Sequence, residues 1–243
     1  MEGSPGMEMA TDEPSLPTLA ERFLSNVRSG APDGHARERI ASIPESRLDD
    51  LDECSALAFW ITLYNAATGA TLLSEPETFE HKRTFFSKPI VTVAGEPVSL
   101  DRIEHGILRG SRWKYGFGYV PNPFPSAFVR RHRLAELDPR IHFALNCGAA
   151  ACPPVSVYTP DAVDEQLDLA AESYLRAETV VDGDVVRVPR LLLWYRGDFG
   201  GGSGIRSLLR EHGVIDPDGR PRIRYREYDW SRDIDAFLEG GVR

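Results

Sequence analysis

The amino-acid sequence predicts an α+β fold, in which a long buried central helix packs on a mostly antiparallel sheet and further helices surround both. Three observations support this prediction. Residues 55–74 contain no charged side chain, which is typical of a helix buried on all sides. Hairpin patterns stand at 89–100 and 179–189. Helical and strand patterns follow one another without the regular alternation of a βαβ protein.

The length of the chain fits a single domain. Its 243 residues are enough for one sizeable hydrophobic core, so we predict one globular domain over residues 16–243. Residues 1–15 are rich in Gly, Pro, Ser and acidic side chains, which predicts a flexible tail. This stretch has neither the basic nor the apolar region of a secretory signal.

Two helices are expected in the first third of the chain. Leu19, Phe23 and Val27 recur at helical spacing. The central helix is expected over 49–73, because acidic side chains occupy its first turns and favour a helix N-terminus. The uncharged run is long enough to cross a bilayer, but Asn65 near its middle is costly in lipid. We therefore interpret it as the buried core helix of a soluble protein.

The middle of the chain predicts a helix followed by an aromatic segment. Ser99 is the expected N-cap of a helix that ends at Gly110. Residues 111–128 combine alternating aromatic side chains with Gly and Pro, which favours a strand or an extended loop. Long aromatic loops are often functional, so this segment is a candidate substrate lid.

The last hundred residues predict strands and amphipathic helices. The strongest strand pattern lies at 140–147, where apolar side chains alternate with small or polar ones. A buried strand followed by a loop is expected at 190–199, and another strand at 222–230. Helical patterns cover 160–177 and 204–213.

Composition excludes some classes of protein. The chain is acidic and arginine-rich, and a net charge of -9 is the opposite of what a nucleic-acid binder needs. Its three cysteines, Cys54, Cys147 and Cys152, are too few for a disulfide framework and fit a reducing compartment. We therefore expect a cytoplasmic protein with a small-molecule or peptide ligand, and neither a nucleic-acid nor a membrane partner. The oligomeric state stays open.

Four stretches of the chain, in this order, resemble the family known as domain of unknown function 547. They are LAFWITLYNA (57–66), VSLDRIEHGILR (98–109), DPRIHFALNCGAAACPP (138–154) and YDW (228–230). The stretch LLLWYRGDF also fits, and the resemblance extends over residues 45–235. It implies no established reaction.

The chain departs from the pattern of the family that it resembles at five positions. Family members usually carry Asn in place of Thr62, Lys-Ser in place of Ala150 and Ala151, and Leu-Asn in place of Arg232 and Asp233. The missing lysine matters most, because a nearby cation lowers the pKa of a thiol.

Cys147 is the candidate nucleophile of the third stretch. It is expected to end a strand, and Gly148 follows it, which exposes a side chain at a corner beside backbone N–H groups. Such N–H groups can stabilise an oxyanion. A thiol also needs a base or a cation to ionise at neutral pH.

His105 is the expected base for Cys147. In a regular strand His142 lies on the face opposite to Cys147, and we expect it to be an interior histidine that orients a neighbouring carboxylate. Glu104 or Asn65 is expected to orient the imidazole of His105, as the third member of a Cys-His-Asn set does. The amide of Asn65 is equally suited to tying a loop to the central helix.

These residues favour a cofactor-free, cysteine-dependent hydrolase or acyl transferase. The main alternative is a binding or scaffold domain in which the same motifs only build the core. A second alternative is a small metal site at His142, Cys147 and Cys152, with His105 as a fourth ligand. A redox pair is less favoured, because the Cys-x4-Cys spacing differs from the usual Cys-x-x-Cys.

Overall fold

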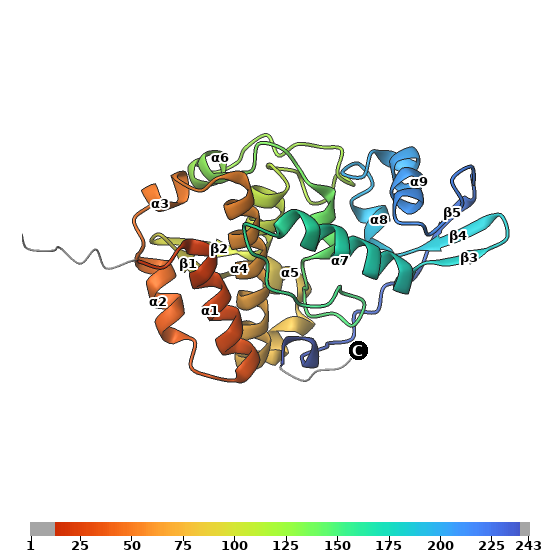
Figure 1. Cartoon of the computed structure of the whole chain (residues 1–243). Coiled ribbons are helices and arrows are strands. Elements are labelled where there is room, and N and C mark those ends of the chain that lie inside the picture. Colours follow the sequence, from red (N-terminus) through yellow and green to blue (C-terminus); the bar gives the residue numbers. More distant parts are fainter. Residues whose placement is uncertain (1–12, 239–243) are drawn as a thin grey trace, which may run out of the picture.

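Helix α4 (Glu53–Ser74) is the centre of the computed structural model, which describes residues 13–238 (Figure 1). It begins four residues later than predicted, because the Asp52 side chain accepts a hydrogen bond from Ser55 N (2.7 Å) and caps it there. Among the described residues it is the one helix long and apolar enough to cross a membrane, and 89% of that apolar window is buried. The structure is therefore consistent with a soluble protein.

Helices cover α4 on several sides. Helix α1 (Leu16–Ser29) packs along it as predicted, and Gly30 ends α1 in the left-handed conformation. Gly69 of α4 permits this close approach, because a Cβ there would lie 2.9 Å from Val27 Cγ1. The other elements around this first core are α2 (Gly34–Ser42), α3 (Ser46–Asp49), η1 (Pro76–Glu80), α5 (Lys82–Ser87), α6 (Ala127–His132) and η4 (Asp235–Phe237).

The strands form two small sheets instead of one. Strands β1 (Pro89–Val93) and β2 (Glu96–Ser99) are an antiparallel hairpin. Its two turn residues both have positive φ, as a type I′ turn requires. Strand β4 (Val185–Val188) pairs antiparallel with β3 (Val180–Asp182) and parallel with β5 (Arg222–Tyr225). The predicted α+β class and both hairpins are confirmed.

A second hydrophobic core lies beside the first. Helix α7 (Val163–Glu178) lies between α4 and the three-stranded sheet, and α8 (Leu191–Trp194) and α9 (Gly201–Glu211) close the far side (Figure 1). The helices over 160–177 and 204–213 were therefore predicted correctly.

The helix after β2 is wider than an ordinary α-helix. Ser99 caps it as predicted, since Ser99 Oγ accepts a hydrogen bond from Arg102 N (3.2 Å). From there η2 (Arg102–Leu108) is a π-helix, a form that is frequent at functional sites. Its apolar face packs on α4.

Two predicted strands are wrong. The segment 140–147 begins with a 3-10 helix, η3 (Pro139–Phe143), because Asp138 caps Arg140 N (2.8 Å) and proline starts the turn. The segment 190–199 begins with α8, whose adjacent Leu191 and Leu192 are both buried in the second core. In both places the apolar side chains are buried by tertiary contacts. A short buried helix then shows the same run of apolar residues as a buried strand.

Two other expectations are corrected in part. The strand predicted over 222–230 ends with β5 at Tyr225. Residues 1–12 of the expected tail lie outside the described residues. The last part of that tail is anchored, because Glu13 forms ion pairs with Arg39 (3.0 Å) and Arg47 (3.1 Å).

Candidate active site

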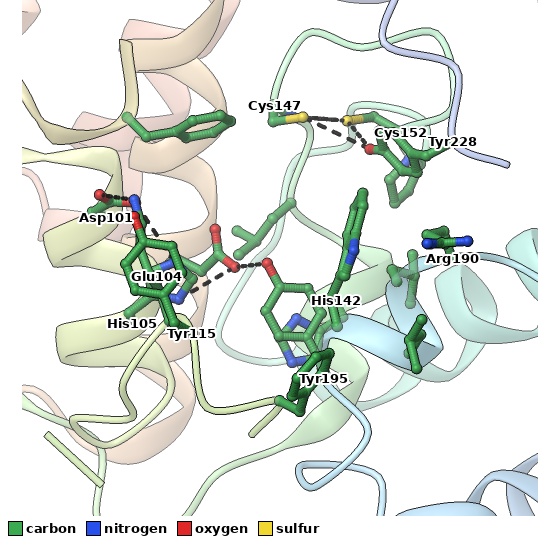
Figure 2. Close-up of a pocket in the computed structure, with 18 of the residues that line it drawn as sticks. Asp101, Glu104, His105, Tyr115, His142, Cys147, Cys152, Arg190, Tyr195 and Tyr228 are labelled. Carbon is green, nitrogen blue, oxygen red and sulfur yellow. Dashed lines mark hydrogen bonds and ion pairs between the residues drawn. The ribbon is translucent and has the colours of Figure 1, made fainter. Parts of the chain in front are cut away.

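A cavity of about 550 Å³ opens between the two cores (Figure 2). One wall comes from α4 and η2, the opposite wall from α8 and the segment after β5, and the turn after η3 closes one end. The side chains that carry chemistry in it are Tyr64, Asp101, Glu104, His105, Lys114, His142, Cys147, Cys152, Arg190, Tyr195 and Tyr228. The cavity therefore gathers residues from all the motifs that the sequence singled out.

Two free cysteines meet at one end of the cavity. The sulfur atoms of Cys147 and Cys152 lie 2.9 Å apart, and the backbone N–H of Cys147 donates to the Cys152 sulfur (3.1 Å). The Tyr228 hydroxyl lies 3.1 Å from the Cys152 sulfur and 3.8 Å from the Cys147 sulfur. Figure 2 shows these three side chains together. We call Cys147 and Cys152 the thiol pair.

A tight turn brings the two sulfurs together. Gly148 has a φ of 90°, and a Cβ at this position would lie 2.4 Å from Leu72 of α4, so only glycine fits. Asn146 braces the turn, because its amide donates to Pro153 O and accepts from Gly148 N, both at 2.7 Å. This turn brings the sulfurs into contact although four residues separate the cysteines, the spacing that had made a redox pair the less favoured prediction.

The two thiols have opposite pKa shifts. Burial raises the pKa of Cys152, but hydrogen bonds from the Cys147 thiol, the Tyr228 hydroxyl and the backbone outweigh burial and lower it to about 7. The pKa of Cys147 is raised well above its usual value by its hydrogen bond to Cys152 and by burial. The thiol pair therefore loses its first proton near neutral pH.

A buried carboxylate lies across the cavity from the thiol pair. Glu104 is 7% exposed; Oε1 accepts a hydrogen bond from Tyr195 OH (2.5 Å), and Oε2 accepts a longer one from Tyr64 OH (3.4 Å). Burial raises the pKa of Glu104, but the neighbouring His105 and His142, Tyr195 and Arg109 outweigh burial and lower it. Glu104 is therefore ionised, and its Oε2 is the less engaged oxygen.

Both ring nitrogens of His105 already face partners. Nδ1 lies 2.9 Å from Arg109 Nη1, and arginine can only donate, so Nδ1 accepts and the hydrogen of the neutral ring is on Nε2. Nε2 faces Asp101 Oδ1 at 3.6 Å. Burial lowers the pKa of His105, and Arg109 lowers it further against the opposing pull of Glu104 and Asp101.

His142 is an interior histidine held by a carboxylate. Its Nε2 lies 2.9 Å from Asp198 Oδ2, and its ring stacks on Tyr195 with 3.7 Å between centroids. Asp198 also accepts a hydrogen bond from the fully buried Arg109 (2.7 Å). His142 therefore fixes the plane of the Tyr195 ring, whose hydroxyl reaches Glu104.

Asn65 ties a loop to the central helix. Its side-chain amide donates to Ala144 O, and its amide oxygen accepts from Asn146 N, both at 2.9 Å. The amide thus holds the residues that precede the thiol pair, which is the second of its two predicted roles. Both ends of the amide bind this backbone, so the role of orienting His105 is not the one that the structure shows.

The direct pair of Cys147 and His105 is not formed. Within residues 13–238 the side-chain hydrogen-bond partners of the Cys147 sulfur are Cys152 and Tyr228, and His105 is held by Arg109 instead. The structure does not bring the ligands of the metal hypothesis together, because among residues 13–238 no group of three His, Cys, Asp or Glu side chains is arranged to hold a metal ion. His142 faces Asp198, not the sulfurs.

Comparison with known proteins identifies the family. The model of the family described as "Protein of unknown function, DUF547" matches residues 48–175, slightly more than half of the chain. The chain belongs to the DUF547 family. Searches of curated proteins and of solved structures found no match. The thiol pair, Glu104 and His105 lie inside the DUF547 match, whereas Tyr195 and Tyr228 lie beyond it.

Sequence reasoning missed several residues of this DUF547 site. Tyr195 and Tyr228 lie in the stretches LLLWYRGDF and YDW, so the resemblance contained a signal for both. Cys152 was expected only as a metal ligand or as half of a less favoured redox pair; it is buried, and its sulfur belongs to the thiol pair. Nothing in the spacing indicates that contact, because the turn geometry creates it.

Proposed function

We propose that this DUF547 protein is a cysteine-dependent hydrolase or acyl transferase. The observation that carries the proposal is the thiol pair in the wall of a 550 Å³ cavity, with the pKa of Cys152 lowered to about 7. A thiolate that exists at neutral pH is the nucleophile that acyl transfer needs. We also propose that the protein acts in the cytoplasm, because the two thiols must stay reduced.

Cys147 is the nucleophile in this proposal, since it is the more exposed of the two thiols. Its sulfur attacks the carbonyl carbon of the substrate, and its proton moves 2.9 Å to the Cys152 sulfur. The Cys152 thiol then gives that proton to the leaving group as the carbon–heteroatom bond breaks. A thioester on Cys147 remains, and Tyr228 stabilises the recovered Cys152 thiolate by a hydrogen bond.

Glu104 serves the second half of the reaction. Its Oε2 accepts a proton from the water or other acceptor that attacks the thioester. The carbon–sulfur bond breaks, and the proton passes from Glu104 to the Cys147 sulfur.

His105 was predicted from the sequence to move the proton. In the proposed mechanism it becomes a positioning residue, because its Nδ1 lone pair is held by Arg109. His142 and Asn65 are positioning residues as well: His142 orients Tyr195, and Asn65 holds the turn.

The test measures thiol reactivity and acylation together. In a Cys54→Ser background, we expect the rate of alkylation by iodoacetamide to rise with a midpoint near pH 7. Incubation with a panel of aryl thioesters is expected to add one acyl group to Cys147 in intact-mass spectra. Cys147→Ser removes the adduct, whereas Cys152→Ser slows its formation. An alkylation midpoint at or above the free-thiol value of about 8.5, with no acyl adduct, would contradict the proposal.

The scaffold alternative expects Cys147 to be buried and inert. Its half-buried position on the cavity wall supports the enzyme proposal instead. If Cys147 reacts only after the protein unfolds, the scaffold alternative holds.

The 2.9 Å contact between the sulfurs favours thiol–disulfide exchange as a second candidate function. One thiolate of the pair attacks a disulfide substrate and releases a thiolate, and the other sulfur then displaces the second thiol. The substrate is reduced and the pair is oxidised to a disulfide. Oxidised glutathione is expected to lower the mass of the protein by two hydrogens, and Cys147→Ser and Cys152→Ser each prevent this loss. Acyl transfer differs, because it survives Cys152→Ser at a reduced rate.

A further inference from the structure

Arg190 places a positive charge on the wall of the cavity. Among residues 13–238 its guanidinium makes no hydrogen bond and no ion pair, and Figure 2 draws it without a dashed line. Lys114 also lines the cavity, but its charge is already paired, since Lys114 Nζ lies 2.6 Å from Asp101 Oδ2. The carboxylate of Glu104 is likewise engaged by two tyrosine hydroxyls. Arg190 is thus free to bind a group brought by a ligand.

Aromatic rings line the same cavity as Arg190. Trp194, Tyr228 and Trp230 pack on one another with ring centroids 4.7 to 5.6 Å apart. Tyr115 and Phe117 face the cavity from the loop after η2, and they are 65% and 52% exposed. Such rings offer flat apolar surface to a ligand.

We propose that the cavity takes acyl substrates that carry a carboxylate or a phosphate together with a flat apolar body. The anionic group pairs with the guanidinium of Arg190, which matches both oxyanions in a two-pronged geometry. The apolar body lies against Trp194 and Trp230. This proposal rests on the proposed function, because it names the substrates of the same thiol pair.

The first test compares two alkylating reagents of almost equal size. Iodoacetate carries a carboxylate and iodoacetamide does not, so the ratio of their rates with the thiol pair reports the attraction for an anion. Arg190→Gln is expected to lower this iodoacetate-to-iodoacetamide ratio about fivefold, since a nearby unpaired charge changes an interaction by about 1 kcal/mol at a partly solvated site. All proteins carry Cys54→Ser, and thermal melting verifies that they fold.

Arg196→Gln is the matched control. It removes the same charge six residues further on, from an exposed side chain that does not line the cavity. The ratio is expected to stay unchanged in this variant. If Arg190→Gln leaves the ratio unchanged, or if Arg196→Gln lowers it equally, the anion site is refuted. If neither reagent reacts with the folded protein, the proposed function itself has failed.

The second test identifies the two parts of the ligand. Phenylacetate, phenyl phosphate and phenylacetamide are compared as protectants of the thiol pair against iodoacetamide. Protection by at least one anion, with none by the amide, is expected, and Arg190→Gln should abolish it. The better anion distinguishes carboxylate from phosphate recognition. Acetate and inorganic phosphate are expected to protect at least tenfold less well, and equal protection by them would refute the apolar part of the proposal.

Discussion

At the scale of single residues, the main feature of the site is the contact between the Cys147 and Cys152 sulfurs. Neither the residue types nor their Cys-x4-Cys spacing predicts this contact. In the proposed mechanism the Cys147 thiol gives its proton to the Cys152 sulfur 2.9 Å away, so Cys152 takes the role that was expected of a histidine. The lysine expected from the resemblance would stand at Ala150, close to the thiol pair in sequence. In the proposed mechanism hydrogen bonds therefore replace a cation in stabilising the thiolate.

Removal of Cys152 is expected to change the ionisation of Cys147. In Cys152→Ala the rise in alkylation rate near pH 7 disappears, and Cys147 ionises above the free-thiol value of about 8.5 because its sulfur is largely removed from water. The measurement is the alkylation rate against pH, with Cys54→Ala as the control that keeps the limb. A midpoint still near 7 in Cys152→Ala would show that another group ionises Cys147.

The same pair makes stability depend on pH. The folded pKa of Cys152 lies near 7, below the unfolded value of about 8.5, so its contribution is absent below pH 7 and grows as the pH rises to about 8.5. The raised pKa of Cys147 acts in the opposite direction above that range. We expect the free energy of unfolding to rise by about 2 kcal/mol between pH 7 and 8.5 and then to fall.

Urea unfolding at a series of pH values measures this dependence. Cys152→Ser is the control, because a serine hydroxyl does not titrate in this range. A pH dependence equal in the two proteins would assign the effect to other groups.

At the scale of elements, α4 positions the site through one buried amide. Asn65→Ala leaves Ala144 O and Asn146 N without their partners in a buried place. Each unsatisfied group costs about 1–3 kcal/mol, so for two groups we expect the free energy of unfolding to fall by about 2–6 kcal/mol. The alkylation midpoint of the thiol pair should also rise, because the turn that holds the sulfurs loosens.

Asn26→Ala is the control for this prediction, since Asn26 Nδ2 donates to Pro32 O (3.2 Å) at the surface. We expect it to change stability by less than about 1 kcal/mol and to leave the thiol midpoint in place. If urea unfolding shows the same loss of unfolding free energy in both variants, Asn65 does not have the structural role inferred for it.

At the scale of the whole molecule, a buried ion pair joins segments from the two cores. Arg109 comes from the end of η2 and Asp198 from the segment after α8, and both side chains are 0% exposed. Asp198→Asn leaves the Arg109 charge buried without its counter-ion. We expect a loss of about 3–5 kcal/mol in the free energy of unfolding.

The exposed pair of Arg187 and Asp182 is the comparison for this change, with side chains 49% and 74% exposed. Asp182→Asn is expected to cost less than about 1 kcal/mol, because water screens that pair. If urea unfolding gives Asp198→Asn a loss no larger than that of Asp182→Asn, the buried pair does not link the cores as we infer.

Sequence patterns determined the α+β class, the central helix and the two hairpins, because these depend on interactions between residues near in the chain. The N-cap at Ser99 and the left-handed turn at Gly110 were predictable for the same reason. The sequence also placed Cys147, Glu104 and His105 among the candidate residues. The single domain over 16–243 stays a prediction.

Only the tertiary structure decided which of these residues meet. The contact between Cys147 and Cys152 depends on a turn packed against Leu72, and the partners of Glu104 come from α4 and α8. Burial in two cores also turned two strand-like patterns into short helices. Alternation in sequence records which side chains are buried, but the path of the backbone follows from packing between segments far apart in the chain.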